Sequence, residues 1–134
     1  MIAATRDGRF EIRPITPDDF TAVLSVYQAC EDFLAMGPEP TASMKMVIDD
    51  VDLSRREGGV FCGIYRTETQ VIGVVDYVPA RADGNSELAF LSLLLIAPPF
   101  RQLGIGNAVV EAIESEIRTN LQIKAILSLF KDPE

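Results

Sequence analysis

The chain has 134 residues, with 20 acidic and 12 basic side chains, no histidine and a formal net charge of −8. This length is typical of one domain, here residues 1–134, and the 48% of hydrophobic residues supply its core. The negative charge argues against nucleic acid as a partner, because phosphate binding requires a basic face. The same field would attract a cationic amine, although acidic surfaces also occur simply for solubility.

Membrane, secretion and metal signals are missing from the sequence. The longest apolar run, residues 88–97, is interrupted by Ser92 and is far shorter than the roughly 20 residues of a membrane span. The first residues, MIAATRDGRFEIRP, contain no apolar signal-peptide core. Cys30 and Cys62 have no metal-type spacing and are predicted to be reduced core residues. We therefore expect a cytoplasmic protein with no membrane partner and no metal site.

The first half of the chain predicts one strand and two helices. A short strand lies within residues 10–15, and Thr16-Pro17-Asp18-Asp19 has the composition of a helix start. The helix that follows should end by Met36-Gly37 and bury an apolar stripe of Phe20, Val23, Leu24, Tyr27 and Leu34. A second helix is predicted over residues 42–56, with Met44, Val47, Ile48 and Val51 facing inward.

The second half predicts a hairpin and then a strand, a helix and a strand. Residues 60–67 and 71–80 form two antiparallel strands around Thr67–Gln70, and a turn-rich loop, 81–85, leads to a central strand. The last strand, residues 124–130, should lie parallel to the central one. The fold class is therefore α/β (α+β), with a mixed, mostly antiparallel sheet of about five strands and helices on both faces.

The stretch from Leu91 to Arg118 organises the chain. An apolar run stops before Pro98, a loop of residues 101–106 follows, and a helix begins with its apolar positions at helical spacing. The unpaired N–H groups and positive dipole end of such a helix can receive an anion. Gly104 and Gly106 let the backbone approach a phosphate closely. The loop thus predicts a diphosphate cradle, although glycines that merely turn the chain would give the same pattern.

Two common nucleotide motifs do not fit this loop. The dinucleotide pattern G-x-G-x-x-G lacks its third glycine, and no Gly-Lys-Ser or Gly-Lys-Thr of a triphosphate loop occurs. What remains is R-x-x-G-x-G after an apolar strand and a proline. This resembles the GNAT family of acyl-CoA-dependent N-acyltransferases, whose strand is followed by V-x-P-x-[Y/F]-R and R/Q-x-x-G-x-G/A. The residues at those places are Ile96, Pro98, Phe100, Arg101, Gly104 and Gly106.

The resemblance implies acetyl-CoA as the acyl donor. The central strand and the strand beginning near Lys124 would splay apart, and the pantetheine arm would pair with backbone groups between them. The diphosphate would lie on the loop N–H groups with Arg101 nearby, while Leu103 offers no charge. The cofactor-binding residues so implied are Leu94, Leu95, Ile96, Arg101, Gln102, Leu103, Gly104, Ile105, Gly106 and Asn107.

The resemblance also implies N-acetyl transfer to an amine of a small molecule, peptide or protein. With no histidine present, Glu87 is the first candidate for the base, ahead of Asp76 and Tyr77, although a solvated strand-end acid would look the same. Contacts to the acceptor are expected within Phe33–Pro40.

The family usually continues with a helix and two strands after this point, so the resemblance implies a shortened C-terminal part: a truncated chain, a minimal variant, or a fold completed by a second subunit. An unpaired edge of the last strand would favour association, such as a homodimer, or poor solubility. A catalytically inactive CoA-binding or interaction module of the same fold is the alternative function. An unrelated α/β phosphate-binding domain, such as a flavodoxin-like one, is a third.

Overall fold

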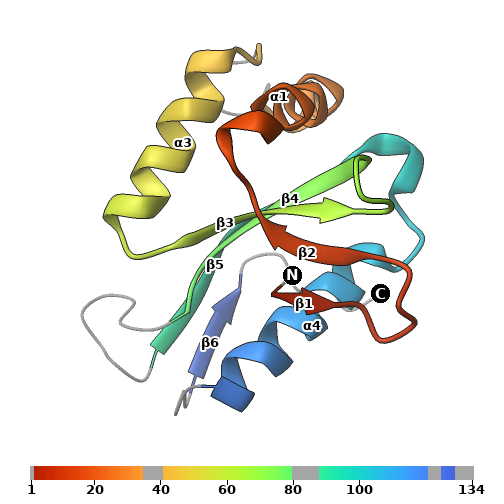
Figure 1. Ribbon diagram of the computed structural model, residues 1–134, viewed down its shortest axis with the longest axis vertical. Coiled ribbons are helices and arrows are strands. Elements are labelled where there is room, and N and C mark those ends of the chain that lie inside the picture. The colour runs from red at the N-terminus through yellow and green to blue at the C-terminus, as the bar shows by residue number, and fades with distance from the viewer. Residues whose placement is uncertain (1, 35–40, 80–87, 121–124, 129–134) are drawn as a thin grey trace.

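The computed structural model describes residues 2–34, 41–79, 88–120 and 125–128 (Figure 1). Six strands form one sheet in chain order, and neighbours are antiparallel except for the parallel last pair. The strands are β1 (Ala3–Ala4), β2 (Glu11–Pro14), β3 (Val60–Tyr65), β4 (Val71–Val78), β5 (Leu88–Ile96) and β6 (Ala125–Ser128). The predicted mixed sheet is confirmed, with the two-residue β1 as a strand that the sequence pattern did not indicate.

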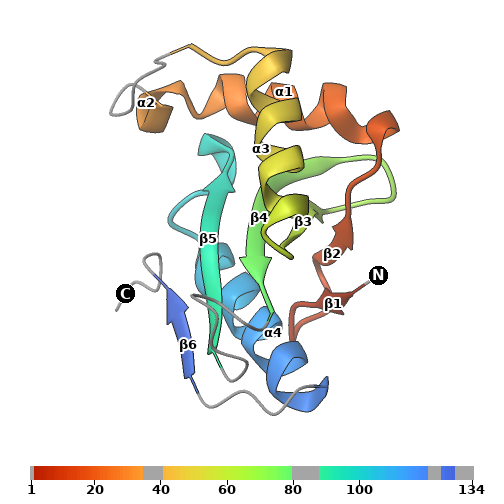
Figure 2. The ribbon, with the colours of Figure 1, turned by 90° about the vertical axis from the view of Figure 1, so that its left-hand side faces the viewer.

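Helices cover both faces of the sheet, as predicted. They are α1 (Phe20–Ala29), α2 (Glu31–Leu34), α3 (Met44–Arg56) and α4 (Ile105–Asn120), with short 3-10 turns at η1 (Pro17–Asp19) and η3 (Pro98–Phe100). Figures 1 and 2 show α1 and α3 on one face and α4 on the other. The predicted end of the first helix, Met36-Gly37, and the loop 81–85 lie outside the described residues.

Each face has its own apolar core. On one, the buried residues Val109, Val110 and Ile113 of α4 pack against Ile64 and Leu91 of the sheet. On the other, residues of α1 and α3 pack against the sheet, and this cluster includes Val23, Tyr27, Cys30, Val47 and Val74. Cys30 and Cys62 are both buried and free, as predicted. Burying each such aliphatic side chain contributes about 1.5–3 kcal/mol, so these two layers hold the sheet in place.

The helix starts follow the local signals closely. The Thr16 N–H donates to Asp19 Oδ2 at 2.9 Å, although the first turn is 3-10 rather than α. At the start of α3, Ser43 Oγ accepts the Met46 N–H at 3.2 Å, which places the cap close to the predicted beginning at residue 42.

The prediction that Ile48 of α3 faces inward was wrong. Val47 and Val51 are buried, but Ile48 is 40% exposed. The buried face of α3 is centred on Val47, Val51 and Ser54. Ile48 lies one residue beyond Val47, about 100° around the helix, and therefore leaves the core.

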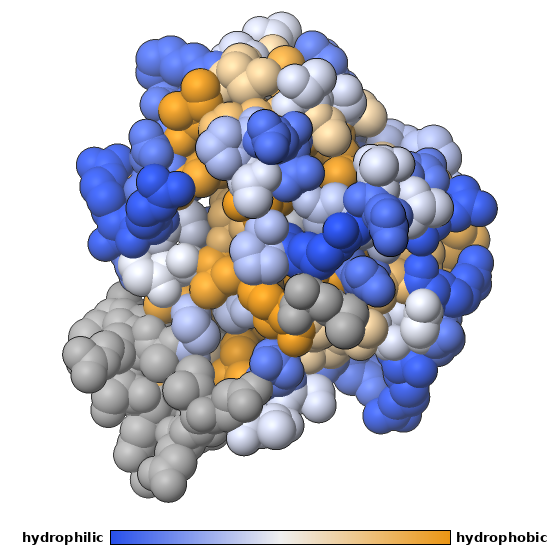
Figure 3. Space-filling view, viewed as in Figure 1, coloured by the Kyte–Doolittle hydropathy of each residue, from blue (hydrophilic) through white to orange (hydrophobic). Residues whose placement is uncertain are grey.

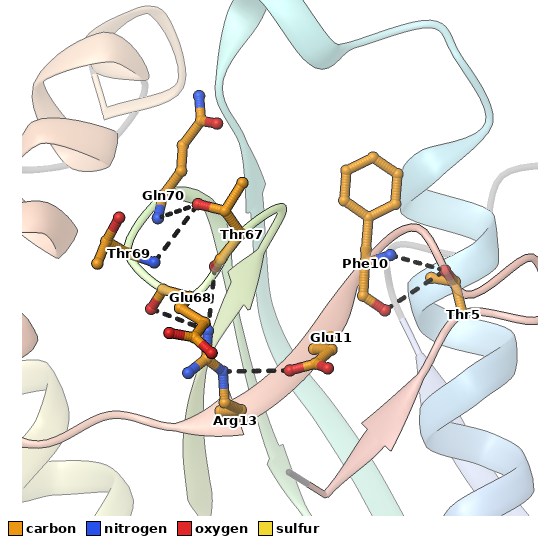
Figure 4. A network of polar contacts seen from close by, with 8 residues as sticks. All are labelled: Thr5, Phe10, Glu11, Arg13, Thr67, Glu68, Thr69 and Gln70. Atoms are coloured by element: carbon orange, nitrogen blue, oxygen red, sulfur yellow. Dashed lines mark hydrogen bonds and ion pairs between the residues drawn. The ribbon is translucent and has the colours of Figure 1, made fainter.

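Arg13 of β2 binds the turn between β3 and β4 (Figure 4). Its Nη2 donates to the carbonyls of Thr67 and Glu68, each at 3.1 Å, and its guanidinium carbon lies 3.7 Å from the centre of the Tyr65 ring. Within the turn, Thr67 Oγ1 accepts the Gln70 N–H at 3.1 Å. The predicted hairpin is thus confirmed, and its turn is fixed by a residue from a different strand.

A bulge divides β5 into two halves. Asp76 lies opposite Leu93 and Tyr77 opposite Leu91, so Ser92 is an extra residue. Ser92 Oγ donates to the Asp76 carbonyl at 3.0 Å. Because the bulge shifts the alternation of side chains, Leu91 packs into the α4 core whereas Leu93 packs toward α1 and α3.

The surface carries mixed polarity. On the face seen in Figure 3, hydrophilic residues cover most of the area and hydrophobic ones show in patches between them. Among the helices of the described ranges, none is long and apolar enough to cross a membrane.

Candidate functional site

The loop between β5 and α4 has the shape that its sequence predicts. Gly104 has φ +76° and Gln102 has φ +61°, so both adopt left-handed backbone conformations within one tight turn. The Ala108 N–H donates to the Gly104 carbonyl at 3.0 Å, which starts the 16-residue helix α4 directly after that turn. A Cβ on Gly106 would have its nearest neighbour, Leu94 Cδ2, at 3.7 Å. The backbone at the start of α4 is therefore uncrowded, as an anion cradle requires.

β5 is paired with β6 along its first half, where Phe90 and Leu91 also pair with β4, and with β4 alone in its second half. β6 pairs with residues 88–91, and within the described ranges no strand pairs with the outer edge of residues 92–96. In Figure 2, β6 lies beside the lower part of β5, and α2 lies beyond the upper end. An extended ligand could add to this open edge as a further strand would.

Strand alternation decides which backbone groups face the open edge. The Ala97 N–H donates to the Ile72 carbonyl at 2.8 Å, so this N–H points toward β4. Successive residues point to opposite edges, so the peptide groups of Leu94 and Ile96 point outward and those of Leu95 point back to β4. The Leu95 carbonyl would indeed clash with a Cβ on Gly73 of β4. Leu94 is therefore better oriented than Leu95 to pair with pantetheine, and the binding role of both residues stays a prediction.

Arg101 closes the end of the open edge. Its Nε donates to the outward carbonyl of Ile96 at 2.8 Å, and the Cys30 thiol approaches the same oxygen at 3.5 Å. Its Nη1 and Nη2 donate to the two carboxylate oxygens of Asp32 at 2.7 and 3.2 Å. The hydrogen bonds to Asp32 raise the pKa of Arg101 further above its ordinary value. Arg101, the cation predicted to contact the diphosphate, is thus paired with Asp32, which lies 69 residues away in the sequence. Sequence reasoning did not predict this pair.

Asp76 is the half-buried carboxylate beside the bulge. Ser54 Oγ of α3 donates to Asp76 Oδ1 at 2.6 Å. Burial raises the pKa of Asp76 to about 6, with smaller contributions from Asp50 and Glu57, while hydrogen bonds from Ser54 and Ser92 oppose the rise. Nearby on α3, Asp50 accepts the Tyr27 hydroxyl at 2.7 Å. Asp76 can therefore exchange a proton close to neutral pH.

The remaining predicted acid–base and acceptor residues differ in how they are placed. Tyr77 is 3% exposed within the α4 core, on the opposite side of the sheet from the Asp76 carboxylate, and burial raises its pKa. Glu87 lies outside the described residues, as does most of the acceptor segment Phe33–Pro40. Residues on either side of that segment are in contact, because Glu31 Oε2 accepts the Ala42 N–H at 3.1 Å. In the part of the chain that the structure describes, no cluster of three metal-ligating side chains occurs.

Comparison with known proteins gives a consistent result. The family model described as the acetyltransferase (GNAT) family matches residues 20–133. A search of the curated proteins found no match.

Solved structures share the fold at low sequence identity. An acetyltransferase from Thermus thermophilus superposes with a TM-score of 0.66 at 21% identity, over 76% of this chain and 65% of that one. The GNAT domain of S. lividans PAT gives 0.62 at 23%, over 92% and 77%. A Brucella melitensis GNAT family acetyltransferase in complex with acetyl-CoA gives 0.62 at 18%, over 88% and 74%. At these identities the likeness concerns the fold alone.

Proposed function

Since the chain belongs to the GNAT family of acetyltransferases, we propose that it transfers an acetyl group from acetyl-CoA to an amine of a small molecule or a protein. The supporting observation is the pairing of two features at one place. The glycine loop that starts α4 directly follows the half of β5 whose outer edge is open among the described residues. A ligand with an anionic diphosphate and an extended, amide-bearing arm is complementary to both features.

The donor would be held mainly by the backbone. The arm would pair with the N–H and C=O of Leu94 and with the N–H of Ile96, because the Ile96 carbonyl already accepts from Arg101. The diphosphate would lie on the N–H groups of residues 102–107, with Arg101 at the side of the cradle. Each such dipole contact contributes about 0.3–1 kcal/mol when exposed, so binding needs several of them together.

The reaction would be direct attack of a neutral amine on the thioester carbonyl. The C–N bond forms, the C–S bond breaks, CoA leaves as the thiolate, and the amine proton passes to a carboxylate. Glu87 remains one candidate for that carboxylate, and Asp76 is another, because it lies opposite Leu93 of β5 and burial raises its pKa to about 6. A backbone N–H of β5 would polarise the carbonyl oxygen. Holding both reactants together supplies up to about 7–11 kcal/mol, more than any single base.

The diphosphate-binding role of the loop is tested by placing a charge at its exposed apolar residue, Leu103. Leu103 is 66% exposed, so Leu103→Lys and Leu103→Glu should leave the thermal stability unchanged. We expect the lysine variant to tighten acetyl-CoA binding by about two- to fivefold, and the glutamate variant to weaken it similarly. The matched controls are Leu53→Lys and Leu53→Glu on α3, where Leu53 is 47% exposed. Equal responses at positions 53 and 103 in calorimetric titrations would refute the cradle.

Transfer itself needs a separate assay. Thiol release from acetyl-CoA over a panel of alkyl, aromatic and peptide amines distinguishes an enzyme from a module that only binds CoA. Binding without release for any amine would favour the inactive module. Thermal stabilisation by NAD or ATP but not by acetyl-CoA would remove the proposal altogether.

A further inference from the structure

Asp32 and Arg101 form a contact between α2 and the glycine loop. Asp32 lies on α2, and Arg101 is the first residue of the glycine loop. The contact is bidentate: Nη1 donates to Asp32 Oδ2 and Nη2 donates to Asp32 Oδ1, while Nε donates to the Ile96 carbonyl. All three donor nitrogens of Arg101 are thus engaged at the end of the open edge.

This arrangement leaves the guanidinium poorly available to a phosphate. Planar guanidinium groups bind carboxylates and phosphates through the same pair of parallel hydrogen bonds, so one guanidinium face cannot serve both at once. The Arg101 side chain is 34% exposed and that of Asp32 is 62% exposed, so the pair is open to an incoming anion. A diphosphate arriving at the adjacent loop would meet a cation that is already neutralised.

We propose that Asp32 and the diphosphate of the acyl donor compete for Arg101, so that Asp32 sets the affinity of the cradle. In the structure Arg101 is held by Asp32; binding of the donor transfers the guanidinium from the carboxylate to the diphosphate. The contact that ties α2 to the glycine loop is then released. This inference rests on the proposed function, because it takes the glycine loop as the diphosphate site.

The test compares Asp32→Asn with a variant of equal charge change elsewhere. Asp49 pairs with Lys45 at 2.6 Å on the exposed side of α3, so Asp49→Asn also removes one negative charge and one exposed ion pair. We expect Asp32→Asn to tighten acetyl-CoA binding by about two- to fivefold relative to Asp49→Asn. S-acetylpantetheine, which carries the arm and thioester without the diphosphate, should bind both variants equally. In Arg101→Gln, the added Asp32→Asn change should have no further effect.

The outcomes are distinct. Equal or weaker acetyl-CoA binding by Asp32→Asn than by Asp49→Asn, or the same gain for S-acetylpantetheine, overturns the competition. Binding of inorganic diphosphate is measured as an independent test. If the wild-type protein binds diphosphate but not acetyl-CoA, the proposed function fails while the competition is still measured with diphosphate. If it binds neither, both proposals fall.

Discussion

The two halves of β5 behave as two different strands. Residues 88–91 are paired with β6, Phe90 and Leu91 are paired with β4 as well, and Ala89 and Leu91 are fully buried in the α4 core. Residues 93–96 are paired with β4, and Leu94 and Ile96 are only partly buried. The Ser92 bulge separates the two halves. The contrast teaches that one continuous apolar run can provide both a structural strand and a candidate binding edge, because hydrogen bonding at its outer edge differs between the halves.

The largest expected effect compares one leucine from each half. Leu91→Ala should lower the free energy of unfolding by about 2–5 kcal/mol, because it leaves a cavity in the fully buried α4 core. Leu94→Ala should cost clearly less, since Leu94 is only partly buried, yet it should alter the edge that the donor arm is proposed to use. Urea unfolding of both variants measures the difference. Equal losses would show that the two halves do not differ in the way described.

The next effect compares the glycines on the two sides of β5. Gly73→Ala on β4 places a Cβ against the Leu95 carbonyl, so the strands must shift, at a cost of about 1–3 kcal/mol. Gly106→Ala at the start of α4 meets only an ordinary contact with Leu94 and should gain up to about 1 kcal/mol from better helix propensity. Thermal unfolding of the pair should therefore shift in opposite directions. A stabilised Gly73→Ala would contradict the close approach on the β4 side.

The smallest effect concerns the carboxylate beside the bulge. Burial raises the pKa of Asp76 from 3.8 to about 6, so the folded chain binds the proton more tightly than the unfolded chain. The stabilisation is complete below about pH 4 and is lost as the pH rises to about 6. Asp76→Asn removes this dependence. The melting temperature of the variant minus that of the wild type should therefore increase from about pH 4 to about pH 7 and stay constant above that.

The control for this pH series is Asp52→Asn, which changes an exposed acid on α3. We expect the difference from wild type to change more with pH for Asp76→Asn than for Asp52→Asn. An equal change for the two variants would show that the fold does not shield the Asp76 carboxyl from water.

Local sequence signals identified much of this architecture. The Thr16–Asp19 helix start, the Thr67–Gln70 turn and the break at Pro98 and Pro99 each depend on a few neighbouring residues, and the structure places them as expected. The strand, glycine loop and helix from residue 91 to 118 were likewise evident from apolar spacing. The cofactor-binding role of the loop residues and the catalytic role of Glu87 stay predictions.

The tertiary structure decided what the sequence left open. It turned Ile48 outward, because the buried face of α3 is set by the sheet beneath it. It turned the peptide groups of Leu95 toward β4, because the register and the bulge fix which edge each residue faces. It paired Arg101 with Asp32 across 69 residues. Propensity and periodicity act over one turn or one strand, so the sequence determined the elements, whereas partners distant in the chain are fixed only when those elements pack.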